Sequence, residues 1–580
     1  MPKKAEIVSI LEEIGVMLEI QGENPFKTRA YQGAARTLEG LEEDLVILVR
    51  EKRLEGVKGI GKAIAEKITR LVEDGDLPYY TNLKNSLPPG LLEMLSIPGM
   101  GPKKVRLVYD KLGLTTIEEL KAACEEHRVA KLPGMGAKSE EKILSGIRNR
   151  EAYGARHRWW DAHQVAAPIL EGLRALPEVK QAEAAGSLRR KMETVGDLDF
   201  LVAATEAEPI MDWFTSREGV HEVTAKGETK SSVRLEGGLQ ADLRVVPPAQ
   251  YAFALHHFTG SKDHNVAMRS RALQRGYSLS EWGVKAESGE EIPEAAKGIQ
   301  SEQELFAFLG LSWIAPELRE GREEIPYHEE NPPPRLIEVS DLRGVFHNHT
   351  NASDGQNTLE EMARAAADRG WTYLGLADHS KASFQARGMD EERLAAQLEK
   401  VKAYNGREDR ALRIFAGVEC DILPDGTLDL DEGILAECDY VVAAVHSAFG
   451  QDEATMTARI IKALEHPLVT MLAHPTGRLL LRREGNAVNL PKVIDAAIAH
   501  NKIIEINAHP MRLDLDWRWW RQAAGRGLRT SINPDAHKTA DFAYVEAGVA
   551  VARKGWLEPR HVFNTLPLEE MEKALADRRP

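Results

Sequence analysis

The chain has 580 residues, of which 43% are hydrophobic and 28% charged, a composition typical of a globular protein with several domains. Its three cysteines are too few and too scattered for a disulfide framework, so we expect a reducing, cytoplasmic setting. The net charge of −15 argues against a general nucleic-acid coat, although acidic and basic residues are nearly balanced over residues 1–150. The N-terminus is amphipathic and no apolar run could span a bilayer, so we expect no membrane partner.

Residues 1–150 are predicted to form helices separated by glycine-containing turns. One pattern occurs three times, apolar-x-Gly-x-Gly followed by a helical stretch: VKGIGKAIAEKI (57–68), IPGMGPKKVRLVY (97–109) and LPGMGAKSEEKI (132–143). Such a turn exposes backbone N–H groups at a helix start, which suits a phosphate. Two copies read PGMG and are followed by lysines, namely Lys103, Lys104 and Lys138. The pattern predicts contacts with the DNA backbone, while the third copy could be purely structural.

Residues 180–247 change to short β-rich runs, two of which carry aspartates. Asp197 and Asp199 in VGDLDFLVA share one strand face, because residues i and i+2 point the same way. Asp242, in ADLRVV, lies at the start of another apolar run, and a neighbouring strand could bring it to the same place. Three carboxylates around two hard cations form the usual clamp for in-line phosphoryl transfer.

A Gly-Ser pair and an arginine before these aspartates fit the same chemistry. Gly186 lets the backbone approach a phosphate, Ser187 adds a hydroxyl donor, and Arg190 could reach phosphate oxygens. The segment GSLRR…VGDLDFLV…DLRVV resembles the palm of family X DNA polymerases, within the nucleotidyltransferase superfamily. The resemblance implies Mg²⁺ or Mn²⁺ held by the three aspartates, with Asp242 on the catalytic metal and helping to deprotonate the primer hydroxyl.

The next segment, HHFTGSKDHNVAMRSRA (256–272), resembles that family's segment for the incoming nucleotide. The resemblance implies two residues near the sugar, a glycine against the nucleotide, an asparagine facing the base in the minor groove and an arginine at the templating strand. In that order the positions are His257, Phe258, Gly260, Asn265 and Arg269. His257 replaces the family's usual tyrosine, and Lys262 stands where some relatives have an acidic residue.

The first glycine pair, in GIGKAIAEKI, resembles the lyase-type small domain of the same family. Lys67 falls at the position of the family's Schiff-base lysine, which needs a depressed pKa to act as a nucleophile. FKTRAY (26–31) matches the phosphate-gripping stretch, with Lys27 and Tyr31 as candidates. Ala63 departs from relatives that have another lysine there. The alternative is that Lys67 is an ordinary lysine on a helix surface.

The proline-rich stretch ENPPPRL (330–336) is predicted to be a linker, because consecutive prolines cannot continue a helix or a central strand. After it, short apolar runs alternate with amphipathic helical segments, which indicates β/α units. Most of the runs are followed by histidines or acids. In a barrel of parallel strands the C-terminal strand ends meet at one mouth. Converging imidazoles and carboxylates there suit Mn, Zn or Fe.

This second set resembles the PHP (polymerase and histidinol phosphatase) domain, a distorted β/α barrel with a multinuclear metal site. The resemblance implies nine metal ligands: His347, His349, Asp354, His379, Glu419, His446, His474, Asp535 and His537. Glu419 would bridge metals, and Mn²⁺, or else Zn²⁺ or Fe²⁺, would support a 3′–5′ exonuclease or another phosphoester hydrolysis, including AP endonuclease activity. Glu505, Asn507 and His509 could line the site. Arg478 and the run WRWW (517–520) could contact DNA, with packing the alternative for the tryptophans.

The whole chain resembles a bacterial or archaeal family X DNA polymerase with a C-terminal PHP domain. We therefore expect a multidomain protein of α+β and α/β class: a lyase-like domain (1–80), a fingers-like helix-hairpin-helix domain (81–152), a palm (153–247), a thumb (248–325), a linker (326–340) and the PHP barrel (341–580). The resemblance implies a nucleoid-associated repair enzyme that fills short gaps with dNTPs and processes 3′ ends of gapped or nicked DNA. A monomer is the default expectation.

Three alternatives remain at this point. The chain could be a repair nuclease or phosphatase whose palm only grips DNA. It could be a scaffold that binds damaged DNA, although binding alone needs neither the carboxylates nor the histidines. It could also be a template-independent nucleotidyltransferase, against which the helix-hairpin-helix set and the pair Asn265 and Arg269 favour templated synthesis.

Overall fold

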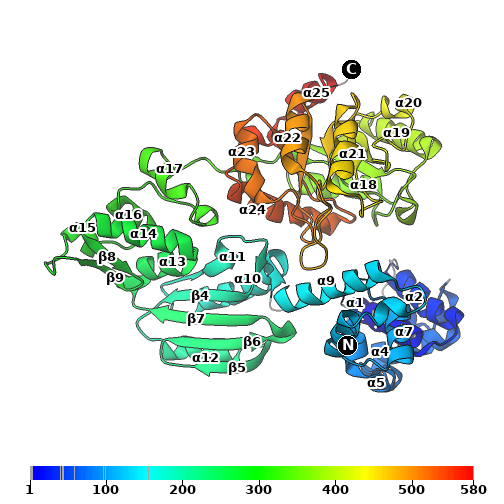
Figure 1. Ribbon diagram of the computed structural model, residues 1–580, viewed down its shortest axis with the longest axis horizontal. Coiled ribbons are helices and arrows are strands. Elements are labelled where there is room, and N and C mark those ends of the chain that lie inside the picture. Colours follow the sequence, from blue (N-terminus) through cyan, green and yellow to red (C-terminus); the bar gives the residue numbers. More distant parts are fainter. Residues whose placement is uncertain are drawn as a thin grey trace. The chain divides into compact units, whose positions relative to one another are not determined.

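The computed structural model describes residues 4–39, 41, 45–57, 59–95, 97, 99–153 and 156–578. It forms two compact units, Met1–Gly154 and Ala155–Pro580 (Figure 1). Within the described ranges, none of the helices has both the length and the apolar character needed to cross a membrane.

The first unit is helical, as its sequence pattern predicts. Buried apolar side chains such as Leu11, Ile14 and Val105 form its core. In each of the three Gly-x-Gly turns the first glycine has a left-handed backbone, with φ of 101° at Gly59, 94° at Gly99 and 74° at Gly134, a conformation that glycine adopts without strain. The helices are α1 (Lys4–Gln21), α2 (Pro25–Glu39), α3 (Leu45–Arg50), α4 (Lys62–Asp74), α5 (Pro78–Asn85), α6 (Pro89–Met94), α7 (Pro102–Leu112), α8 (Ile117–Glu125) and α9 (Ala137–Tyr153).

The second unit begins with a five-stranded sheet in the order β2-β4-β7-β6-β5. The strands are β2 (Gln181–Ala184), β4 (Asp197–Ala203), β5 (Val220–Lys226), β6 (Lys230–Leu235) and β7 (Gln240–Val246). Alternate residues of β4 serve different faces, as the period of a strand requires. Phe200 and Val202 pack with α10 (Trp159–Ala175) and α12 (Glu208–Ser216), whereas Leu201 and Ala203 pack with α13 (Tyr251–Thr259). Both faces of the sheet are therefore covered.

Short elements join this sheet to its neighbours. Helix α11 (Gly186–Arg189) follows β2, and β1 (His157–Arg158) pairs with β3 (Thr194–Val195) just before β4. After α13, a small helical layer with a two-stranded hairpin has its own core. It consists of α14 (Lys262–Gln274), β8 (Tyr277–Ser280), β9 (Gly283–Ala286), α15 (Glu294–Lys297), α16 (Glu302–Phe308) and α17 (Glu324–Glu330). Residues 326–330 of the expected linker are thus helical.

The C-terminal part is a barrel of seven parallel strands in chain order from β10 to β16. A parallel bridge between Asn348 and Ala536 connects the first strand region to the last and nearly closes the barrel. The strands are β10 (Gly344–Val345), β11 (Tyr373–His379), β12 (Arg413–Asp421), β13 (Tyr440–Ala444), β14 (Met471–Leu472), β15 (Ile503–Asn507) and β16 (Arg529–Asn533). The predicted distorted β/α barrel is confirmed.

Helices surround the barrel (Figure 1): α18 (Leu359–Asp368), α19 (Glu391–Asn405), α20 (Glu432–Leu435), α21 (Glu453–Glu465), α22 (Leu490–Ala499), α23 (Trp520–Gly525), α24 (Val545–Lys554) and α25 (Leu568–Ala576). The interior has its own apolar cluster, which includes Phe346, Tyr373, Phe415 and Tyr440. These side chains fill the N-terminal part of the barrel. The inward-facing positions farther along the same strands are therefore free for polar groups at the C-terminal mouth.

Candidate metal centres

The first centre consists of three carboxylates on adjacent strands of the five-stranded sheet. Asp199 on β4 and Asp242 on β7 are direct partners in the parallel register, and Asp197 lies two residues before Asp199. Burial, reinforced by the charges of Asp197 and Asp242, raises the pKa of Asp199 to about 6. Lys230 Nζ lies 2.7 Å from Asp242 Oδ2. Mutual repulsion of this kind is what a divalent cation relieves, so the donor set fits hard metal ions.

Gly186 lies against this centre. Its φ is 56°, and a Cβ atom built on it would lie 2.3 Å from Asp199 Oδ2. The backbone N–H of Ala185 donates to the carbonyl of Asp199 at 2.8 Å, which fixes the approach. Ser187, the next residue of α11, is half-buried. The Gly-Ser pair and the carboxylates are therefore neighbours in space, as the sequence analysis expected.

Arg190 is engaged elsewhere in this conformation. Its Nε donates to Glu320 at 3.0 Å, and its Nη1 donates to the carbonyl of Thr259 at 2.8 Å. Arg189 pairs with Glu302 at 2.8 Å. Both arginines thus join α11 to the helical layer after α13. A phosphate contact by Arg190 stays a prediction.

The five residues predicted to meet the nucleotide and template lie together at the turn between α13 and α14. Asn265 Nδ2 donates to the carbonyls of His257 and Gly260 at 2.7 and 3.3 Å. A guanidinium nitrogen of Arg269 lies 3.2 Å from His257 Nδ1. The Phe258 ring lies 4.6 Å from the Arg244 guanidinium, which comes from β7. Here Asn265 fixes the turn, and its role toward a base stays a prediction.

Lys67 lies on α4 in the first unit. Its Nζ donates to the carbonyl of Ala63 at 3.0 Å and lies 4.8 Å from the ring centre of Tyr79. Lys27 pairs with Glu23 at 3.2 Å. A lysine on the surface of a helix can make the same contacts as a catalytic one, so the lyase role of Lys67 stays a prediction.

The second centre brings together all nine residues of the predicted barrel set. They form four overlapping groups whose donor atoms lie within 4.8 Å of one another. Eight of the ligands lie within four residues of the C-terminal end of their strand, where a parallel barrel collects functional side chains, and Asp354 lies farther along the loop that follows β10. The groups are His349, Asp354, His379 and His537; His347, His474 and Asp535; His347, His349 and Glu419; and His379, Glu419 and His446.

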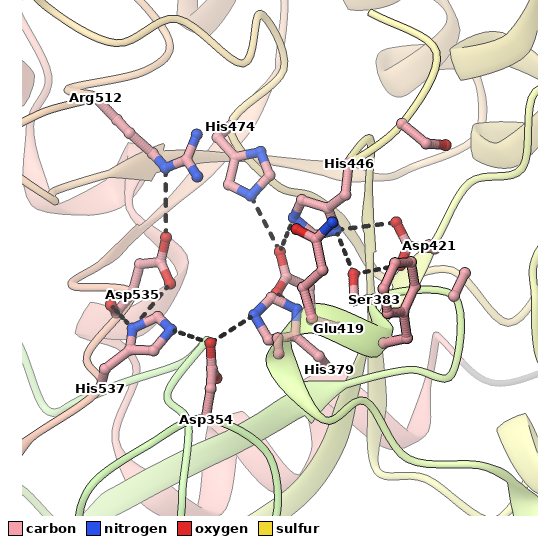
Figure 2. Close-up of a pocket in the computed structure, with 15 residues that line it drawn as sticks. Asp354, His379, Ser383, Glu419, Asp421, His446, His474, Arg512, Asp535 and His537 are labelled. Atoms are coloured by element: carbon pink, nitrogen blue, oxygen red, sulfur yellow. Dashed lines mark hydrogen bonds and ion pairs between the residues drawn. The ribbon is translucent and has the colours of Figure 1, made fainter. Parts of the chain in front are cut away.

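Glu419 lies in the middle of the second centre (Figure 2). Its Oε1 lies 3.2 Å from His347 Nε2, 3.2 Å from His446 Nε2 and 3.0 Å from His474 Nε2. Its Oε2 lies 2.8 Å from His379 Nδ1. One carboxylate oxygen thus faces each half of the cluster, which is the arrangement of a bridging ligand.

Unpaired polar atoms show that this centre fits metal ions. Buried atoms without a hydrogen-bond partner among the described residues include His349 Nδ1 and His474 Nδ1. Leaving such atoms unpaired costs free energy, and coordination would remove that cost. Burial, together with His537 and His379, lowers the pKa of His349 to about 3, so its imidazole is neutral. Neighbouring carboxylates, chiefly Glu419 for His446 and Asp354 for His537, outweigh burial and raise the pKa of His446 to about 10 and of His537 to about 9, so metal binding there would displace a proton.

Carboxylates behind the ligands orient two imidazoles. Asp421 Oδ1 lies 2.9 Å from His446 Nδ1, and Glu505 Oε2 lies 2.9 Å from His347 Nδ1. Each therefore turns the other ring nitrogen, Nε2, toward Glu419, the usual arrangement behind a metal-bound histidine. Asn507 Nδ2 donates to Glu505 at 2.9 Å. Sequence reasoning named Glu505 and Asn507 but missed Asp421, although its i+2 spacing from Glu419 was a usable signal.

The backbone at this centre is strained. His347, His474 and Asp535 have φ values of 56°, 24° and 53°, in the left-handed region that side chains other than glycine rarely adopt. Strain of this kind persists only where the surrounding structure enforces it and is concentrated at functional sites.

The nine-ligand cluster opens into a pocket of about 470 Å³. Arg512 lines it, with its Nε 3.7 Å from Asp535 Oδ2, and was missed by the sequence analysis (Figure 2). Arg478, expected to contact DNA, is instead held by Glu193 at 2.5 Å and Asp516 at 3.1 Å. Trp517 and Trp520 are buried, so packing is confirmed for these two. The pocket combines metal ligands with one guanidinium, a set that suits a phosphate ester.

These features define a class of protein in which a nucleotidyltransferase-like palm is joined to a barrel with a phosphoesterase-type metal centre. Known families match the same regions: a helix-hairpin-helix domain over residues 2–77, a SAM-like helix-hairpin-helix tandem over 91–149, the DNA polymerase beta thumb over 254–320 and the PHP domain over 346–509. The match to the thumb corresponds to the helical layer after α13.

Whole-chain comparison defines the family. The "DNA polymerase/3′-5′ exonuclease PolX" of Bacillus subtilis (strain 168) is 38% identical over 574 residues, 99% of both chains. Rat "DNA polymerase lambda" is 25% identical over 54% of this chain and 56% of its own length. A "Probable phosphatase" of Thermoanaerobacter sp. (strain X514) is 28% identical over 38% of this chain and 89% of its own. The chain belongs to the family X DNA polymerases with a C-terminal PHP domain, as its motifs indicated.

Proposed function

We propose that the protein is a DNA-directed repair polymerase that fills short gaps from dNTPs and carries a metal-dependent 3′–5′ exonuclease in its barrel. The observation that carries the proposal is the presence of two separate donor sets in one chain. Asp197, Asp199 and Asp242 form one on the sheet, and the nine-ligand cluster forms the other in the barrel. Binding DNA without chemistry needs neither, which argues against a scaffold.

In the palm, Asp197 and Asp199 would hold both ions and Asp242 the catalytic one, with Mg²⁺ or Mn²⁺ as the metal. Bound there, the ions would lower the pKa of the primer 3′-hydroxyl and stabilise the leaving pyrophosphate. Burial opposes ionisation of Asp242, but hydrogen bonds from Lys230, Gln240 and Ser232 outweigh it and lower its pKa. Asp242 is therefore a carboxylate at neutral pH, able to accept the primer hydroxyl proton.

In the barrel, Mn²⁺, or else Zn²⁺ or Fe²⁺, would supply an activated water and polarise the phosphate. The protein's own contribution is to hold the ligands and to bind the substrate. Asp421 and Glu505 orient His446 and His347, and the Arg512 guanidinium offers donors to a phosphate oxygen in the pocket. The likeness of the barrel to a probable phosphatase favours phosphomonoester hydrolysis as a second activity of the same centre.

The substrate is gapped or nicked double-stranded DNA, bound through the helix-hairpin-helix turns, with dNTPs as the second substrate. We infer the domain order given above, a monomeric state, association with the nucleoid, and a lyase role for Lys67. The open space around Gly61, Gly101 and Gly136, where an added Cβ would meet no described atom within 4 Å, supports an approach of DNA to these turns.

One gel separates the two activities. A 5′-labelled primer on a one-nucleotide gap is incubated with the full chain, with and without dNTPs, in Mg²⁺ or Mn²⁺. We expect Asp242→Asn to abolish extension and His349→Ala to abolish shortening, each without effect on the other reaction. Asp212→Asn and His466→Ala, which lie outside both donor sets, serve as controls. Shortening without extension in either metal would make the protein a nuclease and refute the polymerase assignment.

A further inference from the structure

The pocket beside the nine-ligand cluster has a wall whose composition the phosphate chemistry does not explain. Besides the ligands and Arg512, a single loop lines it with Ala382, Ser383, Phe384, Gln385 and Ala386. Phe384 is 76% exposed although it borders the pocket. Binding a phosphate requires donors and cations, and none of that is supplied by a phenyl ring.

The loop that presents Phe384 is firmly held. The Ala382 N–H donates to Asp429 at 2.7 Å, and Ser383 Oγ donates to Asp421 at 2.6 Å. The Arg393 guanidinium donates to the carbonyls of Arg387 and Gly388, each at 2.8 Å. The loop is therefore anchored on both sides of Phe384. An exposed side chain on such a backbone is preorganised to bind a ligand, because little further ordering is needed.

The anchor also connects Phe384 to the metal centre. Ser383 Oγ, which donates to Asp421, lies 3.3 Å from Nδ1 of His446, the imidazole that Asp421 orients. The phenyl ring thus follows, by one residue, a side chain that contacts a predicted ligand. Phe384 and the metal ligands therefore border the same pocket.

The ring of Phe384 is unpaired among the residues that the structure describes. None of the described aromatic rings or cations lies against it, and it is outside the apolar clusters of the described chain. Phe449, on the loop after His446, is different: it is 37% exposed and the Arg483 guanidinium lies 4.6 Å from its ring. Single exposed apolar residues are common on protein surfaces. Phe384 is unusual in combining exposure, a rigid backbone and a place in the wall of a metal pocket.

We propose that Phe384 is a specificity-determining residue that stacks on the base of the 3′-terminal nucleotide while its phosphodiester lies at the nine-ligand cluster. This inference rests on the proposed exonuclease function. Base–aromatic stacking tolerates every base, because each has a π face, so the residue selects for the presence of a base and not for its identity.

The test compares two oligonucleotides that differ only in the terminal nucleotide. One ends in an ordinary thymidine and the other in a tetrahydrofuran abasic analogue, so the scissile phosphodiester is the same. Release of the terminal nucleotide is followed in Mn²⁺ with the full-length protein and with Phe384→Ala, Phe384→Trp and Phe449→Ala. We expect Phe384→Ala to reduce kcat/KM for the base-bearing end roughly five- to 150-fold, the range for removing a stacked aromatic, with the abasic end unaffected.

The other variants complete the design. Phe384→Trp should retain the preference for the base-bearing end, and Phe449→Ala should behave like the unaltered protein. Equal losses on both ends in Phe384→Ala, or no loss on either, would overturn the stacking role while leaving the exonuclease intact. If the unaltered protein removes neither terminus, the exonuclease assignment itself fails and the stacking role fails with it. Whether the unaltered protein removes the terminal nucleotide therefore distinguishes a failure of the stacking role from a failure of the exonuclease assignment.

Discussion

Gly186 is the residue whose identity the palm centre constrains most directly. Its backbone has a φ of 56°, and a Cβ would overlap Asp199 Oδ2 at 2.3 Å. An alanine here would both strain the backbone by about 1–2 kcal/mol and displace a predicted metal ligand. We expect Gly186→Ala to reduce primer extension roughly hundredfold, since a shift of about 1 Å at a reacting centre can cost that much. The barrel exonuclease should be unchanged.

A matched control separates strain from displacement. Gly237 has a φ of 81°, but a Cβ there would meet no described atom within 4 Å. Gly237→Ala should therefore lower the melting temperature as Gly186→Ala does, without loss of extension. Equal extension by the two variants in a gap-filling assay would contradict the role given to Gly186.

Asp199 gives the palm a pH dependence. Its pKa is raised to about 6 by burial and by the charges of Asp197 and Asp242. Protons and metal ions compete for this carboxylate, so metal affinity is full above about pH 6 and falls as the pH drops through that value. The Mg²⁺ concentration that gives half-maximal extension should rise about tenfold per pH unit below pH 6 and stay constant above pH 7. A half-saturating concentration that is the same at pH 5.5 and 7.5 would exclude this competition.

The elements could be predicted from the sequence where one local rule decides the outcome. The nine barrel ligands follow from apolar runs with polar residues at their ends, because parallel strands bring such ends to one mouth. Asp197, Asp199 and Asp242 follow from the period of a strand. The linker was placed from its prolines, yet residues 326–330 are helical, because Pro326 lies in the first turn of α17, where the missing N–H needs no helical partner.

Contacts between distant elements could not be predicted in this way. Arg190 was expected at a phosphate, but its partner Glu320 lies 130 residues along the chain, and no local pattern shows that pairing. The same is true of Arg478 and Glu193, which are 285 residues apart. Arg512 was missed because it belongs to no strand end and gains its meaning only from the pocket it borders.

Helix α24 and the short helix at Pro316–Leu318 are joined through a buried carboxylate. Glu317 Oε1 lies 2.7 Å from Arg553 Nε and 3.1 Å from Lys191 Nζ. Burial opposes its ionisation, but the two cations outweigh burial and lower the pKa of Glu317 to about 2. Its folded pKa is below the ordinary value of 4.5, so the stabilisation is complete above about pH 4.5 and is lost as the pH falls toward 2.

We therefore expect Glu317→Gln to destabilise the protein by about 3–5 kcal/mol at pH 7, because it leaves two cations without their buried partner. The difference from the unaltered protein should shrink between pH 4.5 and pH 2. Thermal unfolding across this range measures it, with the exposed Glu330→Gln as control. A difference that is the same at pH 3 and pH 7 would show that Glu317 does not titrate as its partners require.

On the scale of the whole molecule, one chain contains a centre for adding nucleotides and a centre for removing them. Within Ala155–Pro580 the palm and the barrel are joined by ion pairs such as Arg478 with Glu193, and by Lys554, which donates to the carbonyl of Arg190 at 3.1 Å. Glu193 lies four residues before Asp197, and Arg478 lies four residues after His474. One contact thus connects segments that lead directly to both donor sets.

Metal binding should be visible in the stability of the whole chain. An ion that binds only the folded state stabilises it by about 2.7 kcal/mol at a concentration one hundred times its Kd. The buried imidazoles and Glu419 exist as a site only when folded, so Mn²⁺ should raise the melting temperature and a chelator should reverse the effect. Asp242→Asn should keep most of this increase, whereas His349→Ala should lose most of it. Equal increases in both variants would place the stabilising ions outside the barrel.

DNA binding by the whole chain should depend on salt through the second and third glycine turns. Lys103, Lys104 and Lys138 lie in the first turns of α7 and α9, beside the open Gly101 and Gly136. Each phosphate contact releases about one counterion, so changing all three lysines to glutamine should reduce the slope of log K against log salt by about 3. Fluorescence anisotropy with gapped duplex at several salt concentrations measures this slope. The exposed lysines Lys400, Lys402 and Lys492, changed together, remove the same charge from the barrel helices and should leave the slope unchanged. If the two triple variants lose affinity equally, net charge and not the helix-hairpin-helix turns governs the binding of DNA.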